Sequence, residues 1–236
     1  MNKYVSTLLG TLILLTATSA HSRLRLGDEI GNGGGALICK YDLVGVTEIL
    51  FYDEYEARFR YDYDVTRSPG DMTPQESAVA FLESIKKFDP ELFEIAAGYA
   101  RSFIGDAALL VDSRFLNTTD IGFGFLPSNC QYIQLIIQKP PVFPGDQRYW
   151  VDFDHWQLLT NNQKGIAIVH EVLYRHARET NPDMSSSEGL RHFVGLIISN
   201  RVSSLSQAEY NKWKRLAGIL DSTTTANPVE RNTEFQ

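Results

Sequence analysis

The sequence predicts an α+β fold, with a small, mostly antiparallel sheet packed against an αα-hairpin and a C-terminal group of helices. Segments with the two-residue periodicity of strands are grouped together, chiefly before residue 66 and between residues 107 and 151. Capped amphipathic segments are grouped separately, over residues 73–103 and 161–220. Because strands and helices occur in blocks and do not alternate, the pattern favours α+β over a parallel α/β sheet.

The first twenty residues have the layout of a signal peptide. Lys3 precedes an apolar run over residues 5–15, which is followed by the small residues Thr18, Ser19 and Ala20. This run is shorter than the roughly 20 residues that a helix needs to cross a bilayer. We therefore expect cleavage after residues 1–20, one soluble globular domain over residues 21–220 in the periplasm or secreted, and a disordered polar tail over residues 221–236.

Composition limits the classes of partner. The formal net charge is −7 and the 22 Lys and Arg residues are scattered along the chain, so we expect no nucleic-acid surface. No segment after the signal peptide is apolar enough to be an integral membrane span. Cys39 and Cys130 lie in a chain predicted to enter an oxidising compartment, which predicts one disulfide between them.

Residues 36–41 are predicted to form a strand after a glycine-rich turn. The turn formally matches the dinucleotide pattern G-x-G-x-x-A, but that motif should follow a strand and open a helix, so no nucleotide site is expected. Residues 47–65 are predicted to be a helix that runs into a strand at Phe59. Their carboxylates lack the spacing of a calcium loop and are expected on a solvated face; they are Asp53, Glu54, Glu56, Asp62 and Asp64.

An αα-hairpin is predicted next. Thr73, Pro74 and Glu76 have the spacing of a capping box at one helix start, and Asp89 with Pro90 opens a second helix. Residues 107–116 and 130–138 then show the β pattern and look like paired strands, and residues 148–151 predict a further short strand.

The last third of the chain is predicted to be helical. A short amphipathic segment follows Asp152, and three later helices each begin with Ser or Thr placed three residues before Glu or Gln. These capping pairs are Thr160 with Gln163, Ser185 with Glu188, and Ser206 with Glu209.

The stretch "IVHEVLYRH", residues 168–176, is similar to the helix of a zinc peptidase. Such a helix needs histidines at positions i and i+4 to bind zinc, and a glutamate at i+1 to activate water. Here the i+4 position is Tyr174, and His176 points about 120° away from His170 and lies about 9 Å along the helix axis. One metal ion therefore cannot bind both histidines of a straight helix.

A zinc site would need ligands from other segments. His192, on the next predicted helix, is a better candidate than His155, while Asp152 and Asp154 could supply oxygen ligands. This defines the alternative function, a degenerate zincin-like hydrolase with His170 and His192 as metal ligands and Glu171 as the catalytic general base. No serine or thiol hydrolase motif occurs in the chain.

The leading interpretation treats the His-Glu helix as an internal polar brace. Glu171 is placed to pair with Arg175 one helical turn later, and Arg191 on the following helix could join an ionic network between helices. The protein would then be a binding or structural module without a cofactor, whose ligand or protein partner the sequence does not identify.

Four short motifs together resemble a family of exported proteins from predatory and related Gram-negative bacteria. They are "GNGGGALIC", "LPSNC", "HEVLYR" and "SEGLRHF". The resemblance implies that the two cysteines are partners, and it implies no activity. Where the family pattern has an acidic residue after the glycines, this chain has Gly35 and Ala36, which casts doubt on a role for that turn. The positions that match the polar motifs are His170, Glu171, Tyr174, Arg175, Ser187 and Arg191.

Overall fold

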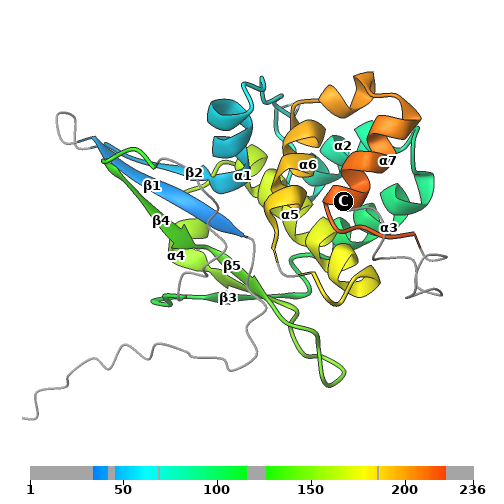
Figure 1. Cartoon of the computed structure of the whole chain (residues 1–236). Coiled ribbons are helices and arrows are strands. Elements are labelled where there is room, and N and C mark those ends of the chain that lie inside the picture. The colour runs from blue at the N-terminus through cyan, green and yellow to red at the C-terminus, as the bar shows by residue number, and fades with distance from the viewer. Residues whose placement is uncertain (1–33, 42–45, 69, 116–125, 185, 222–236) are drawn as a thin grey trace, which may run out of the picture.

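The α+β class is confirmed by the computed structural model, which describes residues 34–41, 46–68, 70–115, 126–184 and 186–221. Helices gather at one end of the molecule and two three-stranded sheets lie at the other (Figure 1). The predicted signal peptide, the cap at Ser185 and the tail beyond residue 221 lie outside the described residues.

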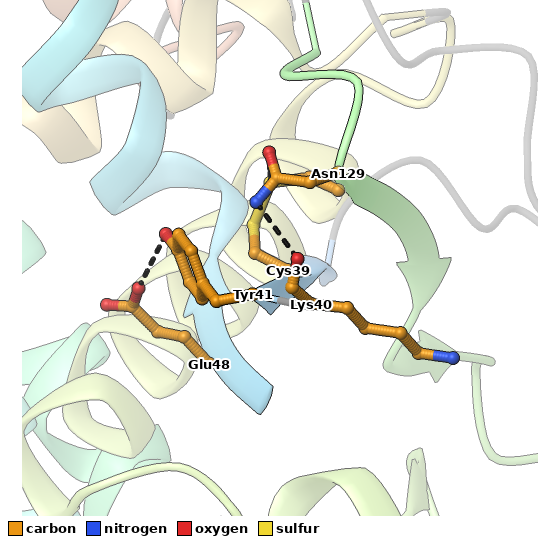
Figure 2. Close-up of a disulfide and its surroundings, with 6 residues drawn as sticks. Cys39, Lys40, Tyr41, Glu48 and Asn129 are labelled. Atoms are coloured by element: carbon orange, nitrogen blue, oxygen red, sulfur yellow. Dashed lines mark hydrogen bonds between the residues drawn. A yellow bond between two sulfur atoms is a disulfide. The ribbon is translucent and has the colours of Figure 1, made fainter. Parts of the chain in front are cut away.

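The first sheet has β1 (Gly35–Tyr41) at its centre, between β2 (Val46–Phe51) and β4 (Cys130–Gln134), and both pairings are antiparallel. Cys39 lies directly opposite Cys130 in the register and is bonded to it, which confirms the predicted disulfide. Figure 2 shows this bond beside Lys40, whose carbonyl accepts a hydrogen bond from Asn129 Nδ2 at 3.2 Å. The disulfide therefore joins two strands that are already hydrogen-bonded neighbours.

The predicted helix-then-strand order of residues 47–65 is wrong. The strand β2 comes first, and the short helix α1 (Tyr52–Tyr55) and the π-helix η1 (Glu56–Arg60) follow it. A short apolar run fits both periodicities, and the hydrogen bonds offered by the edge of β1 decide in favour of the strand. The later aromatic alternation forms no strand because Asp62 adopts a left-handed conformation, with φ of 52°.

The second sheet contains β3 (Ala107–Leu110), β6 (Tyr149–Asp152) and β5 (Ile136–Gln138), in that order. The expected pairing of residues 107–116 with residues 130–138 is wrong, since β3 pairs in parallel with β6, while β4 pairs with β1. Leu135 separates β4 from β5, and its backbone bonds to Gly34 on one side and to Asp152 on the other. One continuous segment therefore connects the two sheets.

Four helices begin where the sequence signals place them, whereas α6 (Glu188–Ile198) begins two residues later than the predicted cap at Ser185 would give. Capping boxes are present at α2 (Pro74–Leu82), α5 (Asn161–Thr180) and α7 (Gln207–Leu216), and Asp89 caps α3 (Pro90–Ser102). Ser187 occupies the cap position of α6 without a side-chain capping bond. Three short pieces complete the described helices: η2 (Glu83–Ile85), α4 (Phe153–Trp156) and η3 (Arg201–Ser204).

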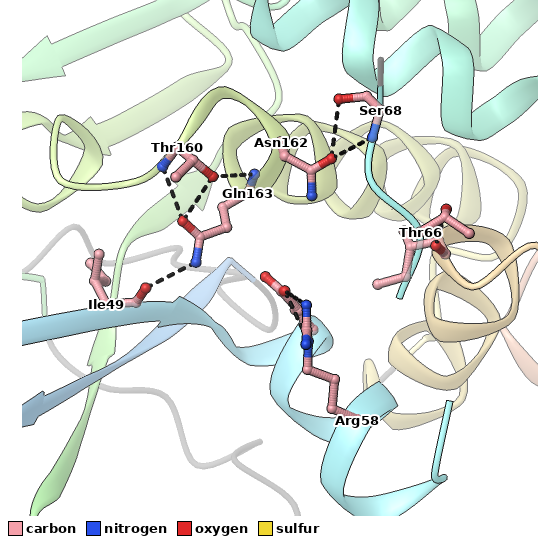
Figure 3. A network of polar contacts seen from close by, with 9 residues as sticks. Ile49, Arg58, Thr66, Ser68, Thr160, Asn162 and Gln163 are labelled. Carbon is pink, nitrogen blue, oxygen red and sulfur yellow. Dashed lines mark hydrogen bonds and ion pairs between the residues drawn. The ribbon is translucent and has the colours of Figure 1, made fainter. Parts of the chain in front are cut away.

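Helix α5 lies among the other elements and contacts α1, α2, α3, α6 and β2. Gly165 allows close approach to α2, because a Cβ at this position would overlap the Ser77 side chain. The start of α5 is held by side chains, as Figure 3 shows: Gln163 Nε2 donates to the Ile49 carbonyl at 3.0 Å, and Asn162 Oδ1 accepts from the Ser68 amide at 2.8 Å. These bonds fix α5 against β2 and against the segment before α2.

None of the helices formed by the described residues has both the length and the apolar character that crossing a membrane requires.

The disulfide generates a stability prediction. Cys39 and Cys130 are 91 residues apart in the sequence, and cross-linking a loop of this size stabilises a fold by roughly 4 to 5 kcal/mol through the entropy of the unfolded chain. We expect the double variant Cys39→Ala, Cys130→Ala to unfold at lower urea concentration, with a loss of roughly 2 to 4 kcal/mol. Reduction of the wild-type protein is the control and should produce a similar loss. Equal stability of the oxidised wild type and the double variant would contradict this prediction.

Candidate functional site

The His-Glu pair lies in the buried part of α5. Every residue from Gly165 to Tyr174 is buried, because neighbouring elements cover this part of the helix on all sides. Neither His170 nor Glu171 therefore faces solvent, and their partners come from other elements of the fold.

His170 pairs with Asp53 of α1. The distance from His170 Nδ1 to Asp53 Oδ2 is 2.6 Å, and the two side chains are 0% and 1% exposed. Burial by itself lowers the pKa of the imidazole, but the adjacent Asp53 carboxylate favours the charged ring, and the net effect is a raised pKa. This pair fixes α5 to the segment that follows β2.

Glu171 is held by the second sheet. Gln138 of β5 donates from Nε2 to Glu171 Oε2 at 2.8 Å and to the Glu171 carbonyl at 3.2 Å. Gly34 lies against Oε1, where any Cβ would overlap the carboxylate, and its φ of 58° also favours glycine. Burial raises the pKa of Glu171 to about 7, although the charge of His170 and the bond from Gln138 both act to lower it.

The expected pair between Glu171 and Arg175 does not form. Arg175 Nε donates instead to Glu179 Oε1 at 3.0 Å, and the guanidinium lies 3.5 Å from the centre of the Tyr99 ring. Arg175 is thus oriented toward the C-terminal end of α5, away from the buried pair.

Arg191 belongs to a different network. Its Nε donates to Glu56 Oε2 at 2.7 Å, and its Nη1 donates to Ser187 Oγ, also at 2.7 Å. Glu56 is also paired with Arg60 at 2.8 Å. Arg191 and Ser187 therefore join α6 to η1, whereas the sequence had suggested a connection from α6 to Glu171 of α5.

The solvated face expected for the carboxylates of residues 53–64 is wrong for the first three of them. Asp53, Glu54 and Glu56 are 1%, 4% and 1% exposed, while Asp62 and Asp64 are exposed. No pattern in the sequence marked the first three as buried. Burial of these carboxylates could have been suspected from the basic and histidine residues of the later helices, because a buried carboxylate needs a partner of that kind.

The histidines proposed as zinc ligands have separate surroundings. His192 Nε2 lies 2.9 Å from the Tyr63 hydroxyl, and its ring stacks on Tyr61 with 4.0 Å between ring centres. His155 Nδ1 lies 2.7 Å from Asp152 Oδ2. Among the residues that the structure describes, no three His, Cys, Asp or Glu side chains are grouped as a metal site would need.

A basic pocket lies beside the C-terminal half of α5, with a volume of about 260 Å³. Two of the predicted residues, Tyr174 and Arg175, line it. Sequence reasoning missed the other cations, although the spacing of Arg175 and Arg178 places both on one side of the helix. The lining residues are Gln138, Lys139, Pro140, Arg148, Tyr174, Arg175, Arg178, Glu179 and Pro182.

Burial of Glu171 predicts a pH effect on stability. Its pKa is about 7 in the folded protein and near 4.5 as an ordinary carboxyl in the unfolded chain. Between pH 4.5 and pH 7 the folded state binds more protons at this group than the unfolded chain does. The stabilisation that the protonated Glu171 carboxyl contributes is therefore fully present below about pH 4.5 and is lost as the pH rises through about 7. Glu171→Gln removes this titration, and we expect urea denaturation to show a shallower loss of stability over that range, by up to roughly 3 kcal/mol.

The control is Glu94→Gln, the same substitution at an exposed position of α3, with its unfolding compared with that of the wild type at each pH. His170 contributes a slope of the same sign in every variant, since its raised pKa also means that stability is lost with rising pH. A wild-type slope in Glu171→Gln would contradict the burial of this carboxyl group.

Comparison with known proteins adds no family to this geometry: no protein-family model, no curated protein and no solved structure matches the chain.

Proposed function

We propose that the protein is an exported binding module that takes a small organic anion into the basic pocket, with the His-Glu helix acting as an internal brace. The observation that carries this proposal is the concentration of positive charge in one pocket of a chain whose net charge is −7. Among the described residues that line the pocket, four side chains are cationic and one, Glu179, is a carboxylate.

The guanidinium groups are oriented by contacts within the protein. Arg148 and Arg175 both pair with Glu179, at 3.5 and 3.0 Å, and Arg178 donates to the Met184 carbonyl. Because these side chains are held before a ligand arrives, less conformational entropy is lost on binding. Arginine forks also match the geometry of carboxylate and phosphate groups.

The remaining walls limit the size and nature of the ligand. Pro140, Pro182 and the buried Tyr174 provide apolar surface next to the cations. A volume of about 260 Å³ is just below the range of roughly 300 to 1,000 Å³ that is usual for drug-sized ligands. The ligand class that fits is therefore a small molecule with an apolar body and one carboxylate or phosphate group.

The brace is supported by the burial of the His-Glu pair. A zincin-like hydrolase would need His170 and Glu171 to reach water and substrate, yet both side chains are buried and are held by Asp53 and Gln138. The geometry therefore favours the binding module over the hydrolase.

Export is supported by two features. The disulfide between Cys39 and Cys130 is of the kind that persists in oxidising compartments. The apolar run over residues 5–15, with Lys3 before it, has the layout of a secretion signal.

Titration calorimetry with benzoate tests the proposed ligand class. We expect benzoate to bind, and its neutral analogue benzamide to bind at least tenfold more weakly, because the charge-assisted hydrogen bonds are lost. The double variant Lys139→Gln, Arg148→Gln should weaken benzoate binding by a similar factor and reduce its dependence on salt.

The matched control is Arg215→Gln, which removes an exposed charge from α7 outside the pocket and should leave binding unchanged. Citrate and inorganic phosphate extend the test to anions without a ring. If the folded protein binds none of these three anions, or binds benzoate and benzamide equally, the proposed function is overturned.

A further inference from the structure

A second cavity, of about 490 Å³, lies between the first sheet and the start of α4. Ile38 of β1 stands directly opposite Gln131 of β4, and both line the cavity together with Lys40. These residues alternate with Cys39 and Cys130, so they belong to the opposite face of the sheet from the disulfide. In Figure 2 the Lys40 side chain extends away from that of Tyr41.

The far side of this cavity carries a histidine oriented by a buried carboxylate. Asp152 is 2% exposed, and its two oxygens accept from the His155 backbone amide at 3.3 Å and contact His155 Nδ1 at 2.7 Å. The His155 side chain is 29% exposed, and over the described ranges of the chain its Nε2 makes no hydrogen bond.

The contact between Asp152 and His155 Nδ1 determines which ring nitrogen carries the hydrogen in the neutral histidine. Because a carboxylate accepts hydrogen bonds, Nδ1 carries the ring hydrogen and Nε2 keeps its lone pair. A histidine held at Nδ1 by a buried aspartate and open at Nε2 has the arrangement of a general base. In such a pair the aspartate positions the ring and stabilises the charge that forms on it.

We propose that this cavity is a hydrolytic site for phosphodiesters, with His155 as the acid–base residue and Asp152 as its positioning residue. The cavity is separate from the basic pocket, and the two share no lining residue.

The charge of the lining residues favours a negatively charged ester. Lys40 and Arg114 both line the cavity and lie on different segments of the chain. Two cations suit a phosphodiester, because they can neutralise its charge and the further charge that develops on the phosphoryl oxygens during attack. A neutral carboxylic ester carries no charge that Lys40 and Arg114 could neutralise in the ground state.

The nucleophile follows from the exposed ring of His155. The Tyr132 hydroxyl, on a described lining residue, lies against Gly35. We assign water as the nucleophile, because an imidazole with a free lone pair at Nε2 can take a proton from water directly.

The reaction balances as a hydrolysis. His155 Nε2 takes a proton from water while the water oxygen forms a bond to phosphorus, and the bond from phosphorus to one ester oxygen breaks. The protonated ring then gives its proton to the departing ester oxygen. The products are a phosphomonoester and an alcohol, and the neutral histidine is regenerated.

A structural explanation for the same pair also exists, because Asp152 caps α4 through its bond to the His155 amide. This role needs the aspartate but not the histidine ring. The ring of His155 is therefore the feature that a test has to address.

The test uses the full disulfide-bonded protein and bis(p-nitrophenyl) phosphate, with release of p-nitrophenolate as the measurement. We expect His155→Gln to lower kcat at least a hundredfold with little change in KM, which is the usual contribution of a general base. Asp152→Asn should lower kcat at least tenfold, because the ring is no longer held by a carboxylate. Lys40→Gln should mainly raise KM.

The matched control is His176→Gln, a histidine of α5 that does not line this cavity and should leave turnover unchanged. Circular dichroism and melting temperature establish that each variant is folded. Modification by diethyl pyrocarbonate gives a second measurement, since Nε2 of His155 should react and abolish turnover in step with the modification. Absence of hydrolysis by the folded wild type, or unchanged kcat in folded His155→Gln, would falsify the proposal.

Discussion

The buried ion pair between His170 and Asp53 is the contact on which the arrangement of the described helices depends. It joins α5, which contacts most of the other helices, to the short segment that follows β2, and neither side chain is more than 1% exposed. Removing one partner of such a pair typically costs about 3 to 5 kcal/mol, because the other charge is left buried without compensation. The position of α5 relative to the first sheet is therefore strongly constrained.

The same short segment supplies a second buried carboxylate, Glu56, which receives Arg191 of α6. Residues 52–60 thus hold both α5 and α6, although this segment forms little more than two helical turns. Asp53 in α1 contacts α5, and Glu56 at the start of η1 contacts α6. Burial of these acids is tolerated only because each has a cationic or histidine partner at hydrogen-bonding distance.

Because His170 and Glu171 are enclosed, the surfaces that a ligand can reach are two cavities elsewhere in the fold. The basic pocket is formed where the C-terminal half of α5 meets the loop after β5, and Gln138 at its edge also holds Glu171. The second cavity is formed where β6 ends and α4 begins, next to the face of β1 and β4 that carries Ile38 and Gln131. In both places, side chains that are far apart in the sequence are brought together by the junction of the two sheets at Leu135.

The sequence by itself determined the local features of this protein: the α+β class, the capping boxes at Thr73, Thr160 and Ser206, and the disulfide. Each depends on residues close in the chain, or on just two cysteines that have no other partner. Only the tertiary structure decided the pairing of β3 with β6, the strand identity of residues 46–51, and the partners of His170 and Glu171. Short apolar runs fit both periodicities, and a carboxylate has the same sequence signature on a surface as beside a buried histidine, so contacts between distant residues had to make these choices.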